Sequence, residues 1–421
     1  MKTGEDEAGA VRRLNSLLEV SMALAGEVDL DPLLSVILAK ATDVMEAETS
    51  TIFLYDEDAE VLRSHVSGQL ARDAVTLKLG VGIAGQVAKT LAVANVPDAY
   101  ADPRFNPRYD RDTGFRTRNI LCGPLQSRDG RLLGVVQLLN KKGRSGFSTD
   151  DQALLLAFAS IAGVAIDRAR LVEAAVESKR IEESLRLAHD IQMGMLTRRF
   201  PSQGVAMHAD LEPARAVGGD FYDLLEQDGR VWFTVGDVSG KGMGAALFMA
   251  ITLTLFRASA EGASSPAEVM SRMNRTLSRD NQRSMFVTVF IALLDIETGR
   301  VTFANGGHNP PYVLRESGVL ECLSYAASPA LGVFEDAVYA NSDLALLPGD
   351  GMLLYTDGVT EAKAPNESFY GEARLEARLR GLAESPPADW VGGIMADVAA
   401  FAAGAPPADD LTLLALRRPR G

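Results

Sequence analysis

The stretch Val235–Leu247, with the sequence VGDVSGKGMGAAL, constrains the fold of this chain most strongly. The residues of Val231–Val235 are β-branched or aromatic, which predicts a buried strand that runs into Asp237. A Ser-Gly-Lys-Gly turn follows, and the apolar segment after it predicts a helix over 244–258. A carboxylate at such a strand end suits a hard divalent cation, and glycine lets backbone carbonyls approach the ion. The alternative is an ordinary capped turn between a strand and a helix.

Four further segments have a similar setting, because each places polar turn residues and glycine or aspartate beside an apolar, strand-like run. They are Val217–Asp223, Asn305–Pro310, Tyr355–Ala362 and Asp409–Thr412. Together with Val235–Leu247 they resemble the motif set of the PPM-type, metal-dependent serine/threonine phosphatases, in the bacterial branch that regulates sporulation and sigma factors. The resemblance covers residues 200–418 and implies that residues 200–421 form an α-β-β-α sandwich.

The resemblance also implies a centre that binds two Mn²⁺ or Mg²⁺ ions. The ligands implied are oxygen atoms of six residues: Asp220, Asp237, Val238, Asp357, Asp409 and Asp410. Asp237 would bridge the two ions, and Asp220, Asp237 and Asp357 would be the catalytic carboxylates. Asp409 and Asp410 are adjacent, and of the two we expect Asp409 to be the ligand. Two such ions lower the pKa of a bridging water and neutralise the charge of a phosphoryl group.

Other polar residues near these motifs have two interpretations each. His308 either donates a proton to the leaving alkoxide or stabilises its own turn. Arg215, five residues before Asp220, either reaches the substrate phosphate or is simply solvated. We interpret three nearby carboxylates as ordinary turn or surface groups: Asp223, Asp350 and Glu361.

The N-terminal part of the chain has a different pattern of short strands and helices. Six strands are predicted, at 50–55, 61–66, 74–79, 92–96, 119–125 and 132–139. This order resembles a GAF domain, a sensory module with an antiparallel sheet and flanking helices, over residues 10–165. Asn140, Lys141, Phe147 and Asp151 match a pattern of cyclic-nucleotide-binding members, but Gln152 replaces its final glutamate. The resemblance therefore implies a possible small-molecule ligand of open identity, and these pattern residues can serve structure instead.

Residues 166–199 predict a helical linker between the two regions, because few residues there interrupt good helix formers. Eight residues follow alternating steps of three and four, which is the spacing of a coiled-coil seam: Leu171, Ala174, Ser178, Ile181, Leu185, Ala188, Gln192 and Met195. Three of them are poor seam residues, namely Ser178, Ala188 and Gln192, so a solvated helix face is the alternative. A paired linker predicts a homodimer.

Composition narrows the classes of partner and location. Of the 421 residues, 47% are hydrophobic and 23% charged, as in soluble globular proteins. The two resemblances together imply the fold class α+β. The net charge of −14 disfavours a nucleic-acid partner. Cys122 and Cys322 lie far apart, and the longest apolar run, Ala153–Ile166, is too short to span a bilayer. We therefore expect a cytoplasmic protein with no membrane partner and a polar, disordered segment at residues 1–9.

These observations predict a GAF-regulated, metal-dependent protein serine/threonine phosphatase. In the branch that the motifs resemble, the usual substrate is a phosphorylated anti-sigma-factor antagonist, so we expect a phosphoprotein of that kind as partner. The alternative is a scaffold, in which a phosphatase-like domain binds a regulator without turnover. The presence of Asp220, Asp237, Asp357 and Asp409 favours the enzyme, because loss of catalysis usually removes some of these carboxylates.

Overall fold

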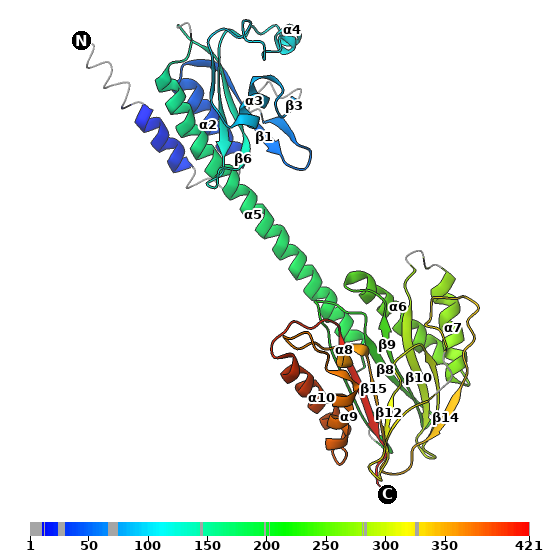
Figure 1. Ribbon diagram of the computed structural model, residues 1–421. Coiled ribbons are helices and arrows are strands. Elements are labelled where there is room, and N and C mark those ends of the chain that lie inside the picture. The colour runs from blue at the N-terminus through cyan, green and yellow to red at the C-terminus, as the bar shows by residue number, and fades with distance from the viewer. Residues whose placement is uncertain are drawn as a thin grey trace. The chain divides into compact units, whose positions relative to one another are not determined.

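The computed structural model describes residues 11, 13–23, 30–65, 75–143, 146–197, 199–201, 203–279, 281, 284–324 and 328–420. The chain divides into two compact units, Met1–Arg180 and Ile181–Gly421, which we describe separately (Figure 1). The disorder expected for residues 1–9 falls outside the described residues. The predicted α+β class is confirmed in both units.

The first unit is built on one antiparallel sheet with the strand order β3-β2-β1-β6-β5-β4. Its strands are β1 (Ala47–Asp56), β2 (Val61–His65), β3 (Thr76–Lys78), β4 (Ala94–Val96), β5 (Ile120–Gln126) and β6 (Leu132–Lys141). Helix α2 (Leu30–Val44) and the start of α5 (Thr149–Met195) share one hydrophobic cluster with the sheet. Helix α3 (Gly82–Thr90) packs in a second cluster with Cys122, and α4 (Arg108–Thr113) is a short helix that we did not predict.

The residues of the cyclic-nucleotide pattern contact one another and neighbouring backbone. The Lys141 ammonium lies 3.0 Å from an oxygen of Asp151, and both side chains are buried. The other Asp151 oxygen accepts bonds from the amide and the hydroxyl of Ser148, at 2.8 and 3.0 Å. Asn140 has a φ of 61° and its side-chain oxygen accepts the Arg118 amide at 2.7 Å. These residues therefore stabilise the fold, and they give no argument for a cyclic nucleotide.

Helix α5 is continuous from Thr149 to Met195, and its side chains meet three environments. Leu155, Phe158 and Ile166 are buried in the core of the first unit. In the middle of the helix, the predicted seam residues Leu171 and Ile181 are 66% and 52% exposed. The last seam positions behave differently, because Gln192 is buried and Met195 packs against the core of the second unit. Those two positions belong to the packing of the second unit.

The second unit contains two antiparallel sheets, ordered β14-β11-β10-β9-β8 and β13-β12-β15-β16-β7. The strands of the first are β8 (Phe221–Gln227), β9 (Arg230–Val238), β10 (Val287–Asp295), β11 (Arg300–Gly306) and β14 (Ser342–Ala345). Those of the second are β7 (Ala206–Glu212), β12 (Tyr312–Leu314), β13 (Leu320–Cys322), β15 (Gly351–Tyr355) and β16 (Leu411–Arg417). Side chains of both sheets, such as Phe233 and Leu414, share one core. The sheets therefore pack face to face.

Helices cover the outer faces of this pair of sheets, which confirms the predicted α-β-β-α sandwich. Helices α6 (Met243–Ala260) and α7 (Pro266–Arg279) contact the first sheet, whereas α10 (Pro387–Ala402), with its neighbour α9 (Gly371–Gly381), covers the second (Figure 1). Helix α7 begins at Pro266, directly after Ser265, and buries Val269, Met270, Met273 and Leu277 along one face. The short helix α8 (Asp357–Thr360) was not predicted.

By length and composition alone, helix α6 could cross a membrane, which the longest apolar run in our sequence analysis did not indicate. Within the second unit, however, Met249, Leu253 and Phe256 of this helix are fully buried in the core shared with the sheet. Their spacing of three and four residues places them on one face. The apolar composition of α6 is therefore explained by packing on β8 and β9.

The buried Lys141–Asp151 pair generates a stability prediction. Lys141→Met leaves the Asp151 carboxylate buried without its cation, so we expect the local free energy of unfolding to fall by about 3–5 kcal/mol. Hydrogen exchange of the β5 and β6 amides in the full chain, in mild denaturant, measures this change. The matched control is Lys142→Met, which removes an exposed ammonium next in sequence. Equal exchange in the two variants would contradict the structural role of the pair.

Candidate metal centre and active site

Asp220 and Asp237 meet because of the register between two neighbouring strands. Strands β8 and β9 pair antiparallel with Phe221 opposite Gly236, so the residue before Phe221 faces the residue after Gly236. The Asp237 carboxylate raises the pKa of Asp220, so the two carboxyl groups lie within electrostatic reach and repel each other when both are ionised. The predicted pair of site residues is thus brought together by the structure.

The second sheet supplies two hydroxyl groups that orient Asp220. One of its oxygens accepts hydrogen bonds from Thr356 at 2.7 Å and from Thr412 at 2.6 Å. Asp220 is almost fully buried, and burial is the main reason why its pKa lies well above the usual range. The nearby carboxylates of Asp237 and Asp410 raise this pKa further. The two threonine hydroxyls therefore fix the position of Asp220, while the neighbouring carboxylates add negative charge beside it.

Asp357 and Asp409 complete a cluster of acidic groups around Asp237. Burial raises the pKa of Asp237 to about 7, and the Asp357 and Asp409 carboxylates add to the increase. Asp357 is the first residue of α8, directly after β15. Burial also raises the pKa of Asp357, with contributions from Glu361 and Asp409. Four of the predicted carboxylates thus lie within electrostatic reach of one another.

The structure distinguishes the adjacent Asp409 and Asp410. Both oxygens of Asp410 accept backbone amides: Ala214 at 2.8 Å, Gly219 at 2.7 Å and Asp220 at 3.3 Å. Asp409 is partly exposed, and one of its oxygens lies 2.8 Å from the Lys241 ammonium. The Asp410 carboxylate therefore ties the segment before β8 to the start of β16. This arrangement leaves Asp409 as the better candidate ligand, and that assignment stays a prediction.

The oxygen-rich donor set fits a hard divalent cation. Close packing at Gly219 also fits, since a Cβ atom there would lie 2.8 Å from the Val238 carbonyl oxygen, which the absence of a side chain leaves open. Within the described part of the chain, however, no three His, Cys, Asp or Glu side chains form a ready-made metal-binding group. Because like charges repel, full convergence of these carboxylates requires a cation among them. The residues that could hold metal are Asp220, Asp237, Asp357, Asp409 and the Val238 carbonyl.

His308 is buried beside the acidic cluster and belongs to a closed turn. Asn305 accepts the His308 amide at 2.7 Å and donates to the His308 carbonyl at 3.0 Å. The Nδ1 atom of His308 lies 3.0 Å from the hydroxyl of Thr288, which pairs with Asp237 across β9 and β10. Burial lowers the pKa of His308 to about 4. A neutral imidazole is a poor proton donor at neutral pH, so the turn-stabilising interpretation is favoured.

Two of the carboxylates that we interpreted as turn or surface groups are buried instead. Asp223 lies within β8 and is fully buried, where it pairs with Arg257 at 2.6 Å. Asp350 is buried in a turn, with Arg315 at 2.9 Å. The interpretation was therefore wrong for Asp223, which is a buried strand residue with an ion pair, whereas Asp350 is a turn residue as interpreted, although its carboxylate is buried. Glu361 is exposed, as is Arg215, whose contact with a substrate phosphate stays a prediction.

Sequence reasoning missed several residues that support the centre. Lys241 contacts Asp409, and the hydroxyls of Thr356 and Thr412 hold Asp220. Thr356 directly precedes Asp357, and Thr412 follows Asp410 by two residues, so their nearness to aspartate within the selected motifs was the available signal. No local pattern linked them to Asp220, because the contacts span 136 and 192 residues.

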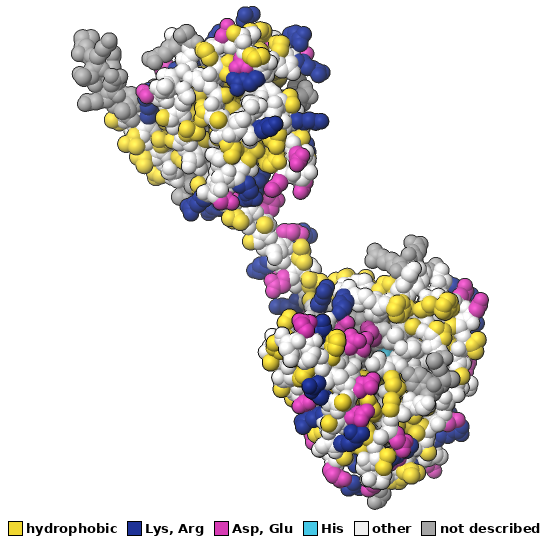
Figure 2. Space-filling view, viewed as in Figure 1, with side chains coloured by type: hydrophobic (Ala, Val, Ile, Leu, Met, Phe, Trp, Pro, Cys, Tyr) yellow, Lys and Arg dark blue, Asp and Glu magenta, His cyan; other side chains and the backbone are white. Residues whose placement is uncertain are grey.

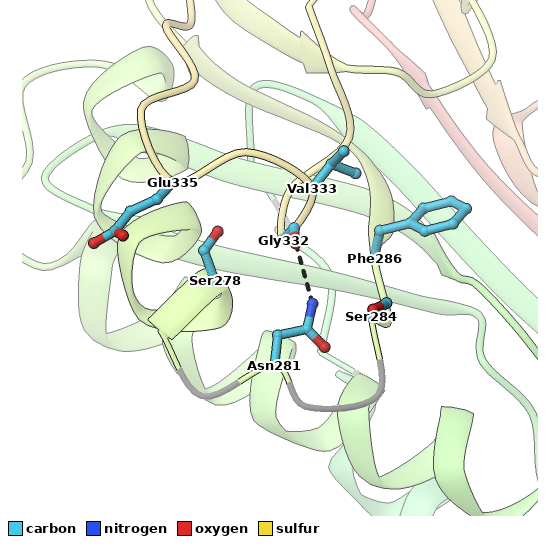
Figure 3. Close-up of a pocket in the computed structure, with 7 residues that line it drawn as sticks. All are labelled: Ser278, Asn281, Ser284, Phe286, Gly332, Val333 and Glu335. Atoms are coloured by element: carbon cyan, nitrogen blue, oxygen red, sulfur yellow. Dashed lines mark hydrogen bonds between the residues drawn. The ribbon is translucent and has the colours of Figure 1, made fainter.

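A pocket of about 310 Å³ lies beside the segment that leads into β10 (Figure 3). It is lined by Ser278, Asn281, Ser284, Phe286, Gly332, Val333 and Glu335. The backbone of Phe286 bonds to Ser239, through its carbonyl to the amide at 2.8 Å and through its amide to the hydroxyl at 2.9 Å. Ser239 follows Asp237 and Val238 in the turn after β9. The pocket therefore adjoins the turn that carries the candidate ligands.

The raised pKa of Asp237 predicts how stability depends on pH. Between the unfolded pKa of about 4 and the folded value of about 7, the folded state binds more protons than the unfolded state, so stability falls as pH rises. In chelator at pH 8.5, Asp237→Asn should therefore raise the free energy of unfolding of this unit by about 2 kcal/mol. The difference should shrink at pH 5.5. Hydrogen exchange of the β9 amides measures both values.

Asp228→Asn is the control for this experiment, because it makes the same chemical change at an exposed turn between β8 and β9. We expect it to leave the pH dependence unchanged. A stabilisation by Asp237→Asn of the same size at both pH values would contradict a titrating, buried carboxylate.

Comparison with known proteins identifies relatives of both units. Residues 227–419 match the family of stage II sporulation protein E, SpoIIE, and residues 29–166 match the GAF domain. Protein IcfG of Synechocystis is 29% identical over 263 residues, which cover 56% of this chain and 41% of the relative. Phosphoserine phosphatase RsbU of Bacillus subtilis is 28% identical over 189 residues, covering 45% and 56% respectively. This chain thus spans about half the length of these relatives.

A solved structure shares the architecture of the second unit. The SiaA-PP2C domain of Pseudomonas aeruginosa matches with a TM-score of 0.53 and 25% identity, over 58% of this chain and 99% of that one. The two-sheet sandwich is the fold that the sequence motifs predicted, whereas the roles of the carboxylates stay predictions. The chain therefore joins a GAF domain to a SpoIIE-type phosphatase domain of the PPM class.

Proposed function

We propose that this protein is a metal-dependent protein serine/threonine phosphatase whose activity is regulated through its GAF domain. The observation that carries the proposal is the cluster of carboxylates around Asp237, in which burial and neighbouring negative charge raise the pKa values of Asp220, Asp237 and Asp357. Such a concentration of buried negative charge is unfavourable unless a cation binds among the carboxylates. Relatives with this domain include an enzyme named phosphoserine phosphatase, which supports the same activity here.

The chain's own residues have distinct tasks in this proposal. When bound, Mn²⁺ or Mg²⁺ ions would supply an activated water and neutralise the phosphoryl charge. The pKa of Asp237 depends on both Asp220 and Asp357, which suits a carboxylate that two ions would share. The Thr356 and Thr412 hydroxyls keep Asp220 in one orientation. Neutral His308 holds its turn against Thr288, so protonation of the leaving group falls to solvent or to another group.

The substrate that we propose is a phosphorylated protein, of the class of anti-sigma-factor antagonists. The support is the sequence resemblance to the sporulation and sigma-factor branch, together with the SpoIIE family match. The pocket beside Ser239 offers space for the polypeptide that flanks a phosphoserine. A cytoplasmic location and a homodimer belong to the same proposal. A scaffold without turnover is the alternative, and the complete set of carboxylates argues against it.

Removal of metal or of a ligand carboxylate tests the activity. We expect hydrolysis of a phosphorylated antagonist protein to require Mn²⁺ or Mg²⁺ and to stop in chelator. Asp237→Asn and Asp357→Asn should each lower kcat by about 100-fold or more, because both act at the centre that activates water. Release of inorganic phosphate measures the rate, and circular dichroism checks the fold.

Asp228→Asn again serves as the control, since it changes an exposed carboxylate on the same domain. It should retain the rate of the unchanged protein. Undiminished hydrolysis in chelator, or in either site variant, would rule out the proposed mechanism.

Regulation through α5 has a structural basis inside the phosphatase domain. The Gln192 amide donates to the Gly218 carbonyl at 2.6 Å and accepts the Gly218 amide at 3.2 Å. Gly218 lies two residues before Asp220. Arg257 of α6 donates to the Met195 carbonyl at 2.6 Å while it pairs with Asp223. A shift of the end of α5 would therefore act on the segment that carries a catalytic carboxylate.

The phase of α5 tests whether this helix transmits a signal as a paired linker. One alanine inserted after Glu182 turns everything downstream by about 100°, whereas seven residues nearly restore the seam. We expect the single insertion to fix the phosphatase in one activity state and the seven-residue insertion to keep regulation. Phosphate release, with and without candidate GAF ligands, measures both.

The same proposal requires the exposed part of α5 to pair with the same helix of a second copy of the protein. The protein should sediment as a dimer, and replacing Ile181 and Leu185 with lysine should weaken that dimer. A monomer at working concentration, or identical behaviour of the two insertions, would show that the linker is only a tether.

A further inference from the structure

Lys241 occupies an unusual place in the turn between β9 and α6. The turn residues Gly240 and Gly242 have φ values of 94° and 78°, which favour glycine on both sides of the lysine. The Lys241 ammonium lies 2.8 Å from an oxygen of Asp409 and donates to the Ala408 carbonyl at 2.5 Å. The Lys241 ammonium, from the turn after Asp237, thus directly contacts Asp409, a candidate metal ligand.

This contact is easily exchanged for another. The side chains of Lys241 and Asp409 are 43% and 38% exposed, and exposed ion pairs contribute only about 0–1 kcal/mol. Lysine also has a long, flexible side chain that can swing into solvent. By contrast, Asp220 is held by two threonine hydroxyls and Asp410 by three backbone amides. Asp409 is therefore the carboxylate of the cluster whose partner is most easily displaced.

We propose that Lys241 is a displaceable counterion that competes with a divalent cation for Asp409. The inference rests on the proposed function, because it assigns Asp409 to the metal centre. The ammonium neutralises Asp409 until a cation binds, and it must leave this carboxylate when the cation takes it. Lys241 is in this sense a positioning residue that sets how readily the centre fills. The same ammonium partly opposes the increase in the Asp357 pKa, which agrees with its place in the cluster.

Calorimetric titration of the full chain with Mn²⁺ tests this competition without any measurement of activity. Lys241→Met should bind Mn²⁺ at one site with a Kd lower by about threefold or more, because the competing charge and its contact are lost. Lys241→Arg keeps the charge and should remain close to the unchanged protein. Lys363→Met is the matched control, since it removes a lysine with 41% exposure whose ion pair is with Glu367 and not with a candidate ligand.

The outcomes separate this inference from the proposed function. If the unchanged protein binds no Mn²⁺, the metal centre and the inference both fail. If it binds Mn²⁺ but Lys241→Met binds equally or more weakly, the inference alone is overturned, and Lys241 only ties the segment before β16 to its turn. A tightening as large in Lys363→Met would show a general charge effect and would also overturn it. Lys241→Gln repeats the test should the methionine variant unfold.

Discussion

Repulsion among buried carboxylates at the edge of two facing sheets is the constraint on which the phosphatase domain depends. Burial raises the pKa of Asp220 and of Asp237, and neighbouring carboxylates raise both further. Such an arrangement persists only where the surrounding structure holds it in place. Here the central strands β9, β15 and β16 supply that rigidity, and the cores on both sides of the sheets are well packed. The fold therefore stabilises a site that is unfavourable by itself.

Local signals in the sequence predicted much of this framework. The apolar run before Asp237 predicted the strand β9, and the apolar segment after the glycine-rich turn predicted the helix α6. The edge strands β13 and β14 were missed, because they have only three and four residues and no apolar alternation. The candidate ligands were found by resemblance to a motif set. Their supports were not, since Thr356 and Thr412 reach Asp220 only through tertiary packing.

The linker shows a similar limit of sequence reasoning. A heptad pattern identifies residues that share a helix face, but it does not show which neighbour occupies that face. Gln192 is a poor residue for a coiled-coil seam, and the structure explains its presence by two hydrogen bonds to Gly218. Leu171 and Ile181 are exposed, so the N-terminal part of the seam is where a partner helix is expected. The predicted seam thus combines residues with two different structural roles.

The contrast between Asp220 and Asp223 shows why the acidic cluster indicates function. Both carboxylates are buried, and they lie three residues apart at the start of β8. Burial raises the pKa of Asp223, but the Arg257 guanidinium opposes the increase through a direct ion pair. Asp220 instead faces Asp237 and Asp410, which raise its pKa further. Arg257 of α6 therefore compensates the structural carboxylate of β8, whereas Asp220 has like charges as neighbours, and that second arrangement is favourable only when a cation binds among the carboxylates.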